Sequence, residues 1–75
     1  MDIPLIHTVI GHVLRGELTH AVVFWAQCVE AMGETRAQAL VRDYFRQFAA
    51  HPPVGIRKAA RTMHDITGVD LPGYF

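Results

Sequence analysis

Residues that stop helices divide this 75-residue chain into four segments, and each segment carries apolar residues at helical spacing. Gly16, Gly33 and Gly68 each follow a segment, and glycine accepts the left-handed conformation with which many helices end. The sequence His51-Pro52-Pro53 separates the third segment from the fourth, because a residue before proline avoids helical geometry. No segment reads as a strand. We therefore predict an all-α fold, a compact bundle of four short helices with an irregular apolar C-terminal tail.

The apolar stripes within these segments define the predicted helices and their core faces. We expect helices over residues 3–15, 18–32, 35–50 and 53–67. Residues that recur every three or four positions lie along one side of a helix and are expected to be buried there. The predicted core consists of Leu5, Ile6, Val9, Ile10, Val13 and Leu14, then Leu18, Val22, Trp25, Val29 and Met32, then Ala37, Leu40, Val41, Tyr44, Phe45 and Phe48, and finally Ile56, Ala59, Ala60, Met63 and Ile66 or Thr67.

Local signals predict how the helices begin and how the chain ends. Asp2 is placed to cap the first helix. Thr35 and Gln38 have the spacing of a capping box at the start of the third helix. The tail after Gly68 is apolar, whereas a disordered tail is more often polar. We expect it to fold back over the groove between the first helix and a neighbour.

The second helix is apolar on more than one side. Val23 and Phe24 fall away from its predicted core seam, near the polar Gln27. Such a helix is either central in the fold or part of an interface. We predict a homodimer through this helix, which Val23→Glu or Phe24→Glu would weaken.

Size and composition favour a single domain, residues 1–75, that associates with something else. The chain is 51% hydrophobic, which is high for so short a monomer because small domains bury a modest fraction of their surface. Its one cysteine, Cys28, excludes an intrachain disulfide and favours a reducing compartment. The sequence contains neither a signal-peptide pattern nor an apolar run that could span a bilayer. We expect a soluble cytoplasmic protein.

The net charge of the chain is zero, but its charged residues are unevenly distributed along the sequence. Residues 1–35 hold one cation and four acids, and residues 36–75 hold six cations and three acids. Arg61 and Asp65 are spaced to pair across one helical turn. Basic outer faces on helices three and four would suit an anionic partner, and helix–turn–helix proteins read DNA in this way. The double proline and the neutral charge of the whole chain weigh against that interpretation.

No pattern for catalysis, metal binding or cofactor binding is present. The chain has five histidines, but His7 and His12 are five residues apart, whereas zinc ligands on a helix are three or four apart. Cys28 lies in an apolar helix, where an unreactive buried thiol is usual. We expect no enzyme activity, no cofactor and no metal.

The sequence therefore predicts a non-enzymatic protein-binding module. A small chain that has no catalytic, metal or cofactor site acts by occupying a surface of a larger partner. Accessory and inhibitory proteins act in this way, and phage-encoded inhibitors are among them. The alternative is a small DNA- or RNA-binding regulator that uses the basic faces of helices three and four. The residues predicted to contact a partner are Val23, Phe24, Gln27, Arg42, Arg46, Arg57, Lys58 and Arg61.

Overall fold

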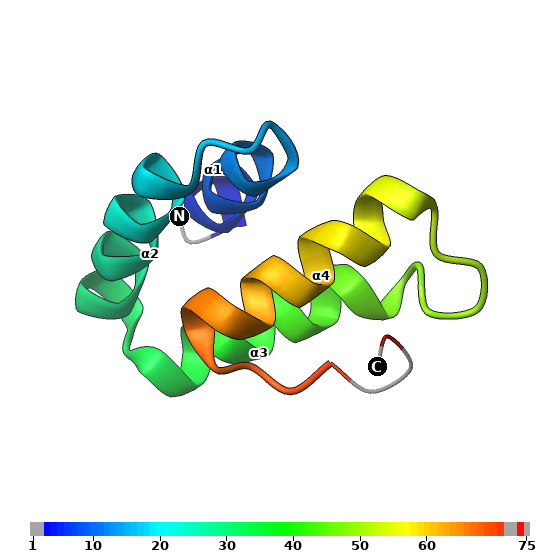
Figure 1. Cartoon of the computed structure of the whole chain (residues 1–75). Coiled ribbons are helices and arrows are strands. Elements are labelled where there is room, and N and C mark those ends of the chain that lie inside the picture. The colour runs from blue at the N-terminus through cyan, green and yellow to red at the C-terminus, as the bar shows by residue number, and fades with distance from the viewer. Residues whose placement is uncertain (1–2, 72–73, 75) are drawn as a thin grey trace.

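The computed structural model describes residues 3–71 and 74, and it confirms an all-α fold (Figure 1). The described residues form four helices and no strand. Asp2, predicted to cap the first helix, lies outside the described residues. The helices are α1 (Ile3–Leu14), α2 (Leu18–Met32), α3 (Glu34–Arg46) and α4 (Val54–Thr67).

The helix boundaries follow the predicted glycines and prolines, but the capping box is wrong. Gly33 lies at φ 86°, and α3 begins directly after it. Thr35 is consequently inside the first turn of α3, and the helix has no side-chain cap. Gln38 instead donates a hydrogen bond from Nε2 to the backbone oxygen of Thr67, 2.9 Å away, and so ties α3 to the end of α4.

The helical geometry of α3 ends at Arg46, four residues before the predicted limit at Ala50. The amides of Phe48 and Ala49 donate to carbonyls three residues earlier, at 3.1 and 3.2 Å. Such bonds tighten the last turn of a helix. Residues 47–50 therefore form turns that lead into His51-Pro52-Pro53.

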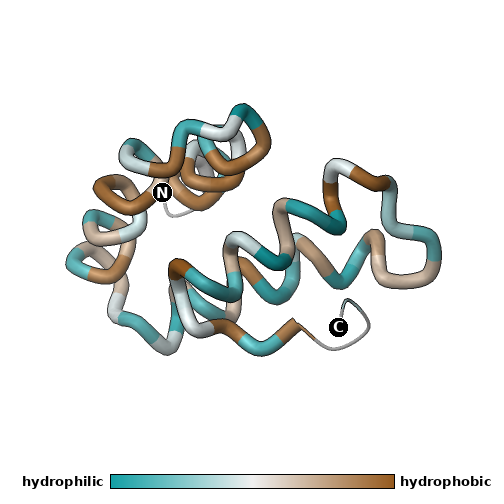
Figure 2. Tube along the Cα trace, in the orientation of Figure 1, coloured by the Kyte–Doolittle hydropathy of each residue, from teal (hydrophilic) through white to brown (hydrophobic). Residues whose placement is uncertain are grey.

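The central helix is α1, and not the second helix as its two apolar sides suggested. α1 packs against each of the other three helices and more extensively than any other helix, whereas α2 packs mainly against α1 and α3. Figure 2 shows hydrophobic segments gathered in α1 and α2, with α3 and the middle of α4 more polar. The core of buried hydrophobic residues comprises Ile6, Val9, Ile10, Val13, Ala21, Trp25, Cys28, Ala37, Val41, Phe45, Ala59, Ala60, Met63, Val69 and Leu71.

The face that α2 turns to the core differs from the predicted seam. Ala21 and Cys28 are fully buried and Trp25 is nearly so, whereas Leu18 and Val22 are 48% and 50% exposed. Small residues at the contact let two helices approach closely. The predicted seam was thus wrong at Leu18 and Val22, because α2 packs through Ala21, Trp25 and Cys28, with Val29 and Met32 partly buried beside them.

The third and fourth helices form an antiparallel hairpin. In Figure 1, α4 runs back across α3 in the opposite direction. Gly68, with φ 72°, ends α4 in the left-handed conformation, as predicted. The hydroxyl of Thr67 donates to the carbonyl of Met63 and accepts a hydrogen bond from the amide of Val69, at 2.6 and 3.1 Å. These bonds fix the direction in which the tail leaves the helix.

The tail folds back onto the helices as expected. Val69 and Leu71 are 1% and 2% exposed. The hydroxyl of Tyr74 donates to the backbone oxygen of Phe45, and the two rings meet edge to face at 5.7 Å. These contacts place the tail along α3, whereas the groove beside the first helix had been predicted. Phe75 lies outside the described residues.

Candidate protein-binding surfaces

The outward side of α2 carries exposed apolar side chains. Leu18 and Val22 lie one turn apart, and Val23 lies about 100° further around the helix. These three side chains are 48%, 50% and 51% exposed. We define the α2 outer face as the exposed residues Leu18, Thr19, Val22, Val23, Ala26 and Glu30.

The charges on and beside the α2 outer face are acidic. Between Gly16 and Thr35 the chain has Glu17, Glu30 and Glu34 and no lysine or arginine. Glu17 is paired with Arg15 and His12, so Glu30 and Glu34 are the acids that remain beside the aliphatic side chains. A partner surface that is apolar at its centre and basic at its rim would complement this face.

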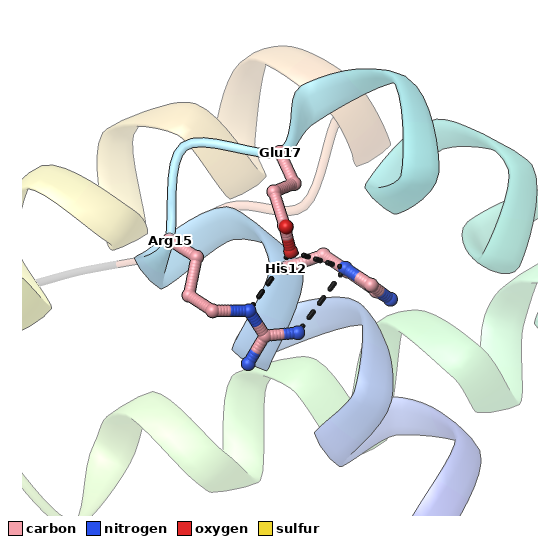
Figure 3. Close-up of polar contacts among 3 residues, drawn as sticks. All are labelled: His12, Arg15 and Glu17. Atoms are coloured by element: carbon pink, nitrogen blue, oxygen red, sulfur yellow. Dashed lines mark hydrogen bonds and ion pairs between the residues drawn. The ribbon is translucent and has the colours of Figure 1, made fainter.

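The turn between α1 and α2 is held by a polar cluster that the sequence reasoning missed (Figure 3). Glu17 Oε1 lies 2.8 Å from both Arg15 Nε and His12 Nδ1. The His12 ring stacks on the rings of His20 and Phe24, with both centroid distances at 5.2 Å. Phe24, predicted to meet a partner, is therefore partly covered by α1.

The hydrogen bonds of this cluster depend on the proton at His12 Nδ1. A protonated Nδ1 donates to Glu17, whereas an unprotonated Nδ1 accepts from Arg15 Nη2, which lies 3.2 Å away. The hydrogen bond from Arg15, followed by the one from His12, holds the pKa of Glu17 below its usual value of 4.5. The cluster stabilises the charged form of this exposed carboxylate.

The outer side of α4 carries three exposed cations near its beginning. We define the α4 basic face as Val54, Arg57, Lys58 and Arg61, and Val54 is 74% exposed. Arg61 does not pair with Asp65 among the described residues, although the spacing allowed it. The three cations make no ion pair or hydrogen bond with the described part of the chain.

Arg42 and Arg46 occupy a different place from the cations of α4. They line a cleft of about 260 Å³ between α3 and the tail, together with Ala49, Leu71 and Tyr74. Arg42 Nε donates to the backbone oxygen of Asp70 at 3.4 Å. Arg46 pairs with Asp43, also at 3.4 Å. Both arginines are therefore already engaged within the chain.

The eight predicted contact residues fall into three groups. Val23 and Gln27 are exposed one turn apart on α2, while Phe24 turns toward His12. Arg42 and Arg46 border the tail, and Arg57, Lys58 and Arg61 lie on the outer side of α4. Leu18, Val22 and Val54 are exposed candidates that the prediction did not include. The two apolar sides of the second helix were the signal for Leu18 and Val22.

Two further properties of the described residues bear on the kind of site. Within residues 3–71 and 74, no cluster of three or more His, Cys, Asp or Glu side chains is arranged to hold a metal ion. None of the helices described has the length and apolar character required to cross a membrane.

A second cleft, of about 250 Å³, lies between α1 and α3 and is lined by Ile6, His7, Leu40, Asp43, Tyr44 and Gln47.

Comparison with protein-family models, with curated proteins and with solved structures found no match.

Proposed function

We propose that this chain is a non-enzymatic protein-binding module that occupies a surface of a larger protein through its α2 outer face. The observation that carries the proposal is the half-exposure of Leu18, Val22 and Val23 on one helix. Single exposed apolar residues are ordinary, but a group of them marks an interaction site. Such binding fits an accessory or inhibitory role, because a chain that covers a surface of its partner excludes the other ligands of that surface.

The size of the apolar group indicates how large the partner contact must be. Completing the burial of three half-exposed aliphatic side chains contributes roughly 1 kcal/mol each. Association itself costs about 4–15 kcal/mol in lost freedom of motion. These side chains therefore form the centre of a wider contact, of about 800 Å² on each protein for a stable complex.

The charge around the face specifies the chemistry of the partner. Glu30 lies on the face, and no cation lies between Gly16 and Thr35. A partner with lysines or arginines around an apolar centre would pair with Glu30 and be steered toward the acidic side of the chain. The proposed occupant is such a surface on a larger protein.

The test compares partner capture by the wild-type chain and by the double variant Val22→Glu/Val23→Glu. Both side chains are exposed, so the variant is expected to keep its helical circular dichroism spectrum. Val54→Glu is the control for adding one carboxylate at an exposed valine on another helix. A captured protein is identified by mass spectrometry, purified and titrated by calorimetry.

We expect the double variant to bind the purified partner at least about tenfold more weakly, because it buries two carboxylates against an apolar surface. Val54→Glu should bind like the wild type. Equal binding by all three proteins would contradict the proposal. Sedimentation of the chain alone tests a second copy as the occupant: a dimer at micromolar concentration that Val23→Glu disperses would assign the face to self-association.

A further inference from the structure

We propose that the α4 basic face is a second docking surface, which binds an acidic segment of a protein. It differs from the α2 outer face in charge and in place. In Figure 1, α2 lies at the left of the molecule, and α4 begins at the upper right. The chain would thus present an apolar, acidic surface to one partner and a basic surface to another.

The cations of this face repel one another and have no intramolecular compensation in the described structure. Arg57 and Arg61 are four residues apart, and Lys58 and Arg61 are three apart, so their side chains are neighbours on the helix. Like charges at these spacings destabilise a helix. An anionic partner removes that repulsion, and the unpaired state of all three cations leaves them available to it.

The first turn of α4 adds a second attraction for a carboxylate. Pro53 precedes the helix, and no side chain caps its amide groups. The beginning of a helix carries partial positive charge, which attracts anions. The first turn is also open, because a Cβ atom built on Gly55 would meet nothing within 4 Å. Uncapped amides and three cations therefore lie on two consecutive turns.

Three features favour an acidic protein over a nucleic acid. Val54 is 74% exposed in the first turn and offers an apolar contact that a phosphate backbone does not use. Asp65, one turn after Arg61, would repel a polyanion that follows the helix. The antiparallel return of α4 along α3 also differs from the steep crossing of a helix–turn–helix reader (Figure 1). A short acidic segment with an apolar residue fits all three.

The experiment uses a fluorescent peptide of about a dozen residues with four glutamates and one leucine. Its binding to the whole chain is measured by anisotropy at low and at physiological salt, beside a DNA duplex of about twenty base pairs. Exposed ion pairs each change affinity by about fivefold or less, so low salt is needed. The key variant is Arg57→Glu/Lys58→Glu/Arg61→Glu, tested also with a peptide whose glutamates are replaced by lysines.

We expect the triple variant to bind the acidic peptide at least about tenfold more weakly and to gain binding of the lysine peptide. Arg46→Glu is the control for charge alone, matched to a single Arg61→Glu, and should have the smaller effect of the two. Val22→Glu/Val23→Glu should leave peptide binding unchanged, which separates this proposal from the function proposed above. Tighter DNA binding through the same three residues would assign the face to nucleic acid. Absence of peptide binding, or equal effects of Arg46→Glu and Arg61→Glu, would overturn the proposal.

Discussion

At the turn between α1 and α2, the carboxylate of Glu17 joins the end of one helix to the start of the next. It accepts hydrogen bonds from Arg15 and from protonated His12 Nδ1 (Figure 3). The backbone takes part as well, since the Glu17 amide donates to the carbonyl of His12 at 2.8 Å. The side chain of Glu17 therefore gives the turn a contact that is sensitive to acid.

We predict that the stability contributed by Glu17 disappears at low pH. Its pKa in the folded state lies below the usual 4.5, chiefly because Arg15 donates to the charged carboxylate. The contribution is therefore fully present above pH 4.5 and is lost as the pH falls through the lowered folded pKa. Glu17→Gln should melt below the wild type at pH 7, and the two melting temperatures should converge in acid.

The matched control for this comparison is Glu30→Gln, an exposed glutamate on the outer side of α2. Its melting temperature should follow that of the wild type across the same range of pH. Salt should reduce the effect at Glu17, because exposed charges are screened. A constant difference between the wild type and Glu17→Gln from pH 7 to pH 3 would show that the charge of Glu17 does not stabilise the turn.

Among the helices, α2 shows most clearly which features can be predicted from sequence. Its existence and its end at Gly33 follow from local residue properties and were predicted correctly. Its orientation depends on the neighbour against which it packs. Hydrophobic periodicity favoured Leu18 and Val22 for the core, whereas the packed structure buries Ala21 and Cys28. The side-chain volume that fits between two helices depends on both of them. The sequence of α2 alone therefore could not show which of its sides is buried.

At the helix ends too, features set by a single residue were predicted correctly, whereas features set by contacts with distant residues were not. Gly68 was predictable because the left-handed conformation is a property of a single residue. The capping box failed because α3 begins at Glu34, one residue before Thr35, and because Gln38 bonds the backbone oxygen of Thr67, 29 positions away. The cluster of His12, Arg15 and Glu17 was missed for a related reason, since it forms only where the chain turns between helices.

The C-terminal tail acts as a fifth structural element. We predict that truncation after Asp70 lowers the melting temperature by roughly 8–16 °C, which corresponds to a loss of about 2 kcal/mol. The loss combines the burial of Leu71, the ring contact of Tyr74 with Phe45 and one hydrogen bond, less the entropy of ordering the segment. Thermal melts followed by circular dichroism measure it.

Tyr74→Phe isolates the contribution of the hydrogen bond to the stability lost on truncation. It keeps the ring and removes only the hydroxyl that donates to the backbone oxygen of Phe45. A loss of about 1 kcal/mol is expected for that variant. Unchanged melting of the truncated chain, accompanied by weaker binding of a partner, would mean that the tail serves recognition and leaves the stability of the fold unaffected.

For the molecule as a whole, one core unites all the helices and the tail. Its buried residues come from α1 to α4 and from Val69 and Leu71. The radius of gyration, 11.2 Å, matches the value of about 11 Å expected for a folded chain of this length. No helix has a core of its own, so no part is expected to remain folded after the others unfold.

We therefore predict a single cooperative unfolding transition. Trp25 lies in the core at 8% exposure, so its fluorescence reports tertiary packing, while far-ultraviolet circular dichroism reports the helices. In a urea titration the two signals should change together, as two-state unfolding requires. Helical signal that persists after the fluorescence change would show that the α3–α4 hairpin is stable without α1.

The separation of buried and exposed residues within α2 has a consequence for the evolution and design of this chain. Ala21, Trp25 and Cys28 hold the helix in the fold, whereas Leu18, Val22 and Val23 are about half exposed. Recognition and folding therefore rest on separate sets of residues within one helix. Surface substitutions away from packing contacts usually change stability by less than about 0.5 kcal/mol. A library that varies Leu18, Thr19, Val22, Val23 and Ala26 can thus acquire new binding specificities while the scaffold that displays them stays the same.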